Sequence, residues 1–313
     1  MARLEAARGN QPVSNERTFE TLIRTWQQSQ QFKDAKPRTQ RGYTHTATYI
    51  SAWSSSLGHP DPTTLNRPAV ESFIALFDDR PTTRRLLLVV LRMVLDQAIY
   101  LGWRADNPAR GIRVRAVKTR VGIWEQSDID AYVAAAEKVG QQEMGAVILT
   151  MWEIGQRLTD VYLFRYGEHY DSEHGCFRFE QSKTDEPVAI PVSRGLRDRL
   201  AVNAGERLHL FHNPRTGRPW VRMRGPLIEA DDTAASKDFA RVREQAVSDG
   251  ARDLKLKWLR HSCVVQLARA GCTVPEIAAI TGHAIQSVHS ILQRYLPRDS
   301  QVAANAQAKR GLM

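Results

Sequence analysis

Residues 268–283 read ARAGCTVPEIAAITGH, and they predict the end of one helix and the whole of a second. The spacing of apolar residues places these helices at about 258–271 and 274–281. His283 follows Gly282 at the point where the second helix breaks. A histidine at such a break usually satisfies a local hydrogen bond and nothing more. Taken alone, His283 therefore predicts no function.

Four residues outside this stretch are equally weak when each is considered separately. Arg157 lies in GQRLTD (155–160), after a predicted apolar helix, and Lys183 lies in the polar turn of a β-hairpin predicted at 175–192. Arg260 lies in WLRHS (258–262), and Tyr295 follows a helix predicted at 285–293. Considered singly, Arg157 is typical of an arginine that caps a helix end, and Lys183 of a solvated lysine in a turn. Arg260 is typical of an arginine whose aliphatic stem packs while its head stays in water, and Tyr295 of a packing tyrosine.

In the order Arg157, Lys183, Arg260, His283 and Tyr295, these residues resemble the active-site set of the tyrosine recombinase (phage integrase) family. The resemblance extends over about residues 16–299. It is carried by 154–160, the Lys183 hairpin, 259–262 and above all 268–283. It implies a mostly α fold with a small β-sheet (α+β), in which an all-α core-DNA-binding domain precedes an integrase-type catalytic domain.

The residue types suit the transfer of a phosphodiester. The guanidinium groups of Arg157 and Arg260 would hold the non-bridging oxygens and stay charged at any working pH. Lys183 would protonate the leaving 5′-oxygen, and His283 would donate a hydrogen bond to the phosphate. Tyr295 would attack phosphorus and form a 3′-phosphotyrosine link. This scheme requires no metal and no cofactor.

Two positions depart from the family's pattern. Lys257 stands three residues before Arg260, where the family often has a histidine that serves as general base. His261 would project about 100° around a helix from Arg260, so the base stays unassigned, with Lys257 as the positional equivalent. Tyr295 lies 12 residues after His283, slightly beyond the commonest spacing, but no other tyrosine follows His283. Asp160 matches an acidic family position and is expected to orient Arg157.

The sequence divides into five predicted segments. They are a flexible N-terminal arm (1–15), a helical core-DNA-binding domain (16–107), a basic linker (108–123), the catalytic domain (124–299) and a C-terminal tail (300–313). Helices are predicted to begin near Thr18, Pro37, Pro68 and Pro81. In the catalytic domain, Ser127 and Asp130 predict a capped helix start. By resemblance, the tail would link neighbouring copies in a homo-tetramer on paired DNA sites, although a frayed tail is the simpler alternative.

The charge of the chain favours a polyanionic partner. Its 44 Lys and Arg against 34 Asp and Glu give a formal net charge of +10, which indicates nucleic acid first and an anionic membrane surface second. With the resemblance, this predicts duplex DNA as the partner, with accessory DNA-bending proteins as further candidates. The residues expected to contact DNA are Lys36, Arg38, Arg41, Arg84, Arg85, Arg110, Arg113, Arg115, Lys118 and Arg120.

Other classes of protein are disfavoured. The three cysteines are widely spaced, without a C-x-x-C pair, which argues against a disulfide framework and for a reducing cytoplasm. No signal peptide is visible, and the longest apolar run, 86–91, is too short to span a bilayer. His169, His174 and Cys176 lack a fourth ligand for zinc. Two alternatives to a recombinase stay open: an integrase-fold DNA-binding regulator without catalysis, which Lys257 favours, and a type IB topoisomerase-like relaxing enzyme.

Overall fold

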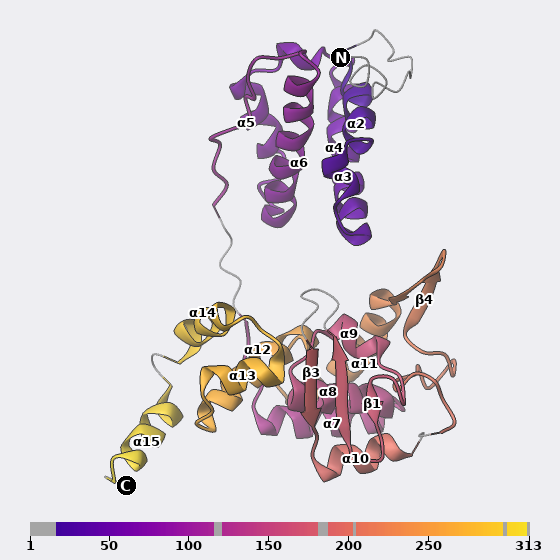
Figure 1. Ribbon diagram of the computed structural model, residues 1–313, viewed down its shortest axis with the longest axis vertical. Helices are drawn as coiled ribbons and strands as arrows, with labels where there is room; N and C mark the ends of the chain where they lie inside the picture. The colour runs from indigo at the N-terminus through magenta and orange to yellow at the C-terminus, as the bar shows by residue number, and fades with distance from the viewer. Residues whose placement is uncertain (1–16, 116–120, 181–186, 203–204, 297–298, 312–313) are drawn as a thin grey trace, which may run out of the picture. The chain divides into compact units, whose positions relative to one another are not determined.

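The computed structural model describes residues 17–115, 121–180, 187–202, 205–296 and 299–311 (Figure 1). Contacts divide the chain into two compact units, Met1–Thr119 and Arg120–Met313. Helices dominate both units, and two small antiparallel sheets complete the second, so the predicted α+β fold is confirmed. The predicted N-terminal arm, Lys118, Arg120 and Lys183 lie outside the described residues.

The N-terminal unit is helical, as predicted. Its elements are α2 (Phe19–Gln27), α3 (Gln30–Lys33), α4 (Pro37–Ser56), η1 (Pro62–Thr64), α5 (Arg67–Ala75) and α6 (Pro81–Tyr100). Thr18 caps α2 by accepting a hydrogen bond from the backbone N–H of Thr21, and prolines in the first turns of α4, α5 and α6 suit positions that need no N–H donor. The four predicted helices correspond to α2, α4, α5 and α6, whereas the short α3 was not predicted.

The core of this unit forms around α6, whose apolar face is fully buried. Trp53 of α4 stacks on Phe73 of α5, with ring centroids 4.4 Å apart. The segment after α6 joins the same core through Ala109 and Ile112. Arg92 of α6 fixes this segment, because its guanidinium donates to the carbonyl oxygens of both residues.

The C-terminal unit contains most of the chain's elements. They are α7 (Gln126–Lys138), α8 (Gln142–Ile154), α9 (Leu158–Leu163), β1 (Tyr170–Asp171), β2 (Cys176–Glu180), β3 (Pro187–Pro191), α10 (Arg194–Ala201), β4 (Val221–Arg224), β5 (Leu227–Ala230), α11 (Asp232–Ser248), η2 (Leu256–Trp258), α12 (Leu259–Arg269), α13 (Val274–Thr281), α14 (Ile285–Tyr295) and α15 (Ser300–Lys309). No helix in the described part of the chain has both the length and the apolar composition needed to cross a bilayer.

Helix α8 lies at the centre of this unit, and its buried residues share one core with α7, α11 and the sheet. In the three-stranded sheet the order is β1-β2-β3, and Phe177 of β2 pairs with Ile190 of β3. The predicted hairpin at 175–192 is therefore confirmed. A smaller core joins α12, α13 and α14 through Val264, Ile277 and Val288.

One sequence-based expectation for this unit needs correction, and one of its hairpins was not predicted. The capping box at α7 is formed by Glu125 and Asp128, and not by Ser127 and Asp130: the backbone N–H of Glu125 donates to the Asp128 carboxylate over 2.7 Å. The helix therefore begins two residues earlier than the S-x-x-D pattern indicated. The hairpin β4–β5 was not predicted, because only its base is buried and its exposed strands lack the alternation of a half-buried strand.

Candidate active site

The site is built where α8 ends and two later helices approach it. Gly155 follows α8 with a left-handed backbone (φ 59°). A Cβ on Gly155 would lie 2.8 Å from Sγ of Cys263 on α12 and 2.9 Å from Cγ2 of Thr281 on α13. Only glycine suits both the conformation and the space. The adjacent Gln156 is buried, and its amide donates to the carbonyl oxygen of Ile280 over 2.8 Å, so the loop that leads to Arg157 is fixed on α13.

Arg260 lies in the first turn of α12 and is only 8% exposed. Its Nη1 donates to the carbonyl oxygen of Gly155 over 2.7 Å, and its Nε donates to Nε2 of His283 over 3.2 Å. Its Nη2 is buried, and no hydrogen-bond acceptor in the described part of the structure satisfies it. A buried charged donor without a partner is costly. An incoming anion would satisfy it.

His283 follows the left-handed Gly282 (φ 59°), which ends α13. The ring therefore turns back toward the helix, and Nδ1 lies 2.9 Å from Oγ1 of Thr281. Its other nitrogen accepts from Arg260. The helix break predicted from the sequence thus aims both ring nitrogens at defined partners.

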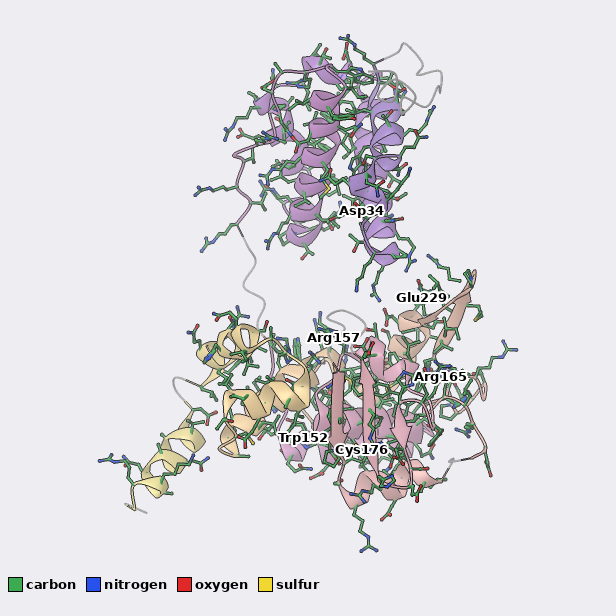
Figure 2. The ribbon with its side chains drawn as sticks, viewed as in Figure 1. Asp34, Trp152, Arg157, Arg165, Cys176 and Glu229 are labelled. Carbon is green, nitrogen blue, oxygen red and sulfur yellow. The ribbon has the colours of Figure 1, made fainter. Side chains whose placement is uncertain are left out.

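Arg157 lies at the N-terminal end of α9, with its side chain 23% exposed. Its Nη1 is 3.7 Å from Oδ2 of Asp160, whose own side chain is 6% exposed. Asp160 thus has the orienting position expected for it. In Figure 2, Arg157 lies at one edge of the C-terminal unit, and α10 lies at the opposite edge (Figure 1). We refer to Arg157, Arg260 and His283 as the Arg–His cluster.

The electrostatics of the Arg–His cluster favour an anion. Burial, followed by the charge of Arg157, lowers the pKa of Arg260 to about 10. Burial, followed by the charges of Arg260, His261 and Arg157, lowers the pKa of His283 to about 3. The pKa of His261 is also lowered, by burial and then by Arg260 and Arg294. All three pKa values are lowered for the same reason: the protonated form of each group is poorly solvated and lies close to other positive charges.

Among the described residues, no hydrogen bond joins the Tyr295 hydroxyl to the Arg–His cluster. Tyr295 is the last residue of α14 and packs against the small core of α12, α13 and α14. Its hydroxyl is buried, and within the described residues it has no hydrogen-bond partner, neither Arg260 nor His283. The nucleophile predicted from the sequence is thus held on the same subdomain as Arg260 and His283 but is not bonded to them.

The remaining predicted residues are dispersed. Lys257 is exposed in η2, one turn before Arg260. The predicted DNA-contact residues that are described all belong to the N-terminal unit, where they lie at the start of α4, in the first turns of α6 and after α6. They are Lys36, Arg38, Arg41, Arg84, Arg85, Arg110, Arg113 and Arg115. Arg84 pairs with Asp78, and Arg110 pairs with Asp96.

Two residues that the sequence did not single out shape the site. Gly155 lies two residues before Arg157, and Thr281 lies two residues before His283. Their contacts come from helices far apart in the sequence, so only their positions next to the motif residues could have marked them. His261 interacts electrostatically with two residues of the site: the charge of Arg260 helps to lower the pKa of His261, and His261 helps to lower the pKa of His283.

The described residues contain no group of three or more histidine, cysteine or acidic side chains arranged to hold a metal ion. His169 of the disfavoured zinc trio accepts a hydrogen bond from the backbone N–H of Arg165. His174 of the same trio is bonded to Asp171.

Comparison with known proteins decides the family. Residues 124–301 match the model of the phage integrase family. The chain belongs to this family. No curated protein sequence gives a significant match.

Solved structures of integrases share the fold. A lambda integrase dimer bound to a COC′ core site has a TM-score of 0.73 at 17% identity, covering 95% of this chain and 85% of that chain. A lambda integrase tetramer bound to a Holliday junction has a TM-score of 0.70 at 16% identity, covering 92% and 84%. The Tn1549 transposon integrase in complex with a circular intermediate DNA has a TM-score of 0.70 at 15% identity, covering 94% and 100%.

Proposed function

We propose that this integrase is a site-specific DNA recombinase that cleaves and rejoins duplex DNA through a 3′-phosphotyrosine intermediate on Tyr295. The observation that carries the proposal is the Arg–His cluster, in which two arginines and a histidine share one poorly solvated site and Arg260 keeps a buried Nη2 unsatisfied. Such a site suits the phosphorus centre of a phosphodiester, whose non-bridging oxygens gain negative charge as a fifth bond forms.

In the cleavage step, Arg157 and Arg260 bind the two non-bridging oxygens. The phenolic oxygen of Tyr295 loses its proton and forms a bond to phosphorus, while the bond from phosphorus to the 5′-oxygen breaks. The departing 5′-oxygen takes a proton from Lys183 and becomes a hydroxyl. A 5′-hydroxyl from a second strand reverses these steps and rejoins the DNA, so no external energy source is required.

The hydroxyl of Tyr295 has no hydrogen bond to Arg260 or His283 among the described residues, and the side chain packs against the small core. We propose that DNA binding brings this hydroxyl and the phosphate together. The acceptor of its proton is unassigned; Lys257 occupies the position of the family's usual base and is exposed one turn before Arg260.

The proposed partners follow from the charge and from the structural relatives. The exposed arginines of the N-terminal unit would bind the DNA backbone. A homo-tetramer on paired sites is proposed because lambda integrase, which shares this fold, has been solved as a tetramer on a Holliday junction. Integration or excision of a phage or another mobile element is the biological role that this chemistry suits, and accessory DNA-bending proteins remain a prediction.

One assay separates this proposal from its two alternatives. A plasmid with two copies of the protein's site, selected beforehand from random duplexes, is incubated with the protein, and its products are sized after deproteinisation. A recombinase yields deleted or inverted plasmid that depends on the sites. A topoisomerase-like enzyme relaxes plasmids that lack the site, and a DNA-binding regulator binds the site while leaving the plasmid unchanged; either result would refute the proposal.

A further inference from the structure

Thr281 is a fully buried threonine that links the end of α13 to His283. Its Oγ1 lies 2.7 Å from the carbonyl oxygen of Ile277 and 2.9 Å from Nδ1 of His283. A carbonyl oxygen can only accept, so the single hydroxyl proton of Thr281 is directed at Ile277. Toward His283, the hydroxyl oxygen is then an acceptor.

The same conclusion is reached from the other side of the imidazole ring. The Nε–H of Arg260 is a donor and cannot accept, so Nε2 of His283, 3.2 Å away, must present its lone pair. The ring is neutral at working pH because burial and the nearby cations hold the pKa of His283 at about 3. Its single proton therefore lies on Nδ1 and is donated to Thr281. The two contacts agree on one tautomer.

We infer that Thr281 is a positioning residue: its hydroxyl holds His283 in the Nδ1–H tautomer, so that Nε2 orients Arg260 and leaves Nη2 of that arginine to the phosphate. The inferred tautomer is a property of the free protein. Its role in strand cleavage rests on the proposed function.

This arrangement changes the role expected for His283. A neutral ring with its proton on Nδ1 has no proton on Nε2, and so it cannot donate through Nε2 to a phosphate oxygen. Before DNA binds, His283 acts as an acceptor that aligns Arg260. It becomes a donor to phosphate after Nε2 takes up a second proton from solvent water, which a bound phosphate anion favours by opposing the charge of the two arginines.

Two substitutions at Thr281 and one elsewhere isolate the hydroxyl contact. Thr281→Val removes the hydroxyl at nearly constant shape, and Thr281→Ser keeps it. Thr150→Val is the matched control: Thr150 on α8 is also fully buried, and its Oγ1 donates to the carbonyl oxygen of Ala146 over 2.8 Å. Both Thr→Val changes remove one bond within a helix, but only Thr281→Val removes the partner of His283.

The first readout is the tautomer in the full-length protein without DNA. Nitrogen-15 NMR of histidine-labelled protein, with the His283 signals assigned through His283→Asn, distinguishes a protonated ring nitrogen from an unprotonated one. Wild type, Thr281→Ser and Thr150→Val are expected to carry the proton on Nδ1. Thr281→Val keeps the Arg260 contact but loses the acceptor for Nδ1–H, so the proton is expected to lie partly on Nε2.

The second readout is the rate of covalent adduct formation on nicked duplex DNA. Thr281→Val is expected to slow this rate about 10-fold or more, since it weakens a hydrogen bond to a charged group, whereas Thr281→Ser and Thr150→Val stay near the wild-type rate. A wild-type ring protonated on Nε2, or a Thr281→Val ring with the wild-type tautomer, would overturn the inference. A wild type with the expected tautomer that forms no adduct would instead refute the proposed function and, with it, the role of Thr281 in cleavage.

Discussion

Arg260 donates a hydrogen bond from Nη1 to the carbonyl oxygen of Gly155 over 2.7 Å, across 105 residues of sequence. This bond joins the start of α12 to the end of α8. It also joins the two arginine motifs, because Arg157 follows Gly155 by two residues. The separation of the two guanidinium groups therefore depends on the backbone of Gly155.

Replacing Gly155 by alanine should disrupt this junction. The substitution forces a side chain into a left-handed conformation and places Cβ within 3 Å of Cys263 and Thr281. We expect Gly155→Ala to lower the free energy of unfolding, with about 1–2 kcal/mol from the backbone and about 1–3 kcal/mol more from overpacking. Urea denaturation and adduct formation should both show the defect.

Gly140→Ala provides the control for this prediction. Gly140 also has a left-handed backbone (φ 68°), but a Cβ there would meet nothing within 4 Å. It should show the backbone cost alone and keep its cleavage activity. Equal destabilisation by the two variants would mean that the close approach at Gly155 has no energetic consequence.

The depressed pKa of His283 predicts a loss of stability in acid. In the unfolded chain the imidazole takes up a proton near its ordinary pKa of 6.5, whereas in the folded protein it does so only near about 3. Between these values the unfolded chain binds more protons, so stability falls as the pH is lowered from 6.5 toward 3. Replacing His283 by asparagine should reduce this slope, measured as the urea midpoint of the C-terminal unit at several pH values.

The exposed His289 on α14 gives the corresponding control. His289→Asn should leave the slope as in the wild type. The buried His212 and the half-buried His261 also have lowered pKa values and contribute to the same slope, so His283→Asn should diminish it without abolishing it. A slope unaffected by His283→Asn would show that His283 is not held neutral by its surroundings.

Arginines on α6 and in the segment that follows α6 should govern the salt dependence of DNA binding. Arg85, Arg92, Arg110 and Arg113 line one open hollow of about 640 Å³. Arg92 is used to anchor the backbone, while Arg85 and Arg113 are exposed. Replacing both Arg85 and Arg113 by alanine should make the slope of log K against log salt less negative by about two, as expected for two lost phosphate contacts.

Arg194→Ala serves as the control, because the side chain of Arg194 is 95% exposed and the residue belongs to α10, the helix at the edge of the C-terminal unit opposite Arg157 (Figures 1 and 2). Its salt slope should match the wild type. If the double variant also matches the wild type, the hollow does not contact the DNA backbone.

The C-terminal helix should act in assembly and not in cleavage. In the free chain α15 lies against its own α12: Asp299 pairs with Arg269 over 2.8 Å, and Asn305 donates to the carbonyl oxygen of Arg269. Deleting residues 300–313 should block the joining of two DNA sites, seen in native gels, while adduct formation continues. Asn305→Ala, which keeps the helix, should still allow joining. Unchanged recombination by the truncated protein would show that residues 300–313 are not needed for joining two DNA sites.

The sequence predicted the helices well because each carries local signals of its own. The apolar spacing from Phe19 to Trp26, the proline at the start of α6 and the glycine after α13 act within a few residues, so they could be interpreted without the fold. The start of α7 was misplaced because Glu125 and Ser127 can both cap a helix. In the structure Glu125 is also held from α12, where Arg269 and Gln266 donate to its carboxylate, and no local pattern contains those contacts.

The candidate site could be predicted as a set of residue types but not as a geometry. The motif order identified Arg157, Arg260 and His283, and the structure joins the last two by a hydrogen bond. The role of Thr281 and the need for glycine at 155 depend on the approach of α8, α12 and α13. The packed position of Tyr295 in the free protein likewise depends on tertiary contacts, which a linear motif does not report.

The most direct test of the central claim is covalent trapping on a nicked suicide duplex that carries the protein's own site, with wild type compared with Tyr295→Phe. The nick releases a short strand after cleavage, so an attached protein cannot rejoin the DNA. The account predicts that wild type forms a denaturant-resistant protein–DNA adduct and that Tyr295→Phe binds the duplex equally well but forms none. Tight binding by wild type without any adduct, or an adduct that persists in Tyr295→Phe, would contradict it.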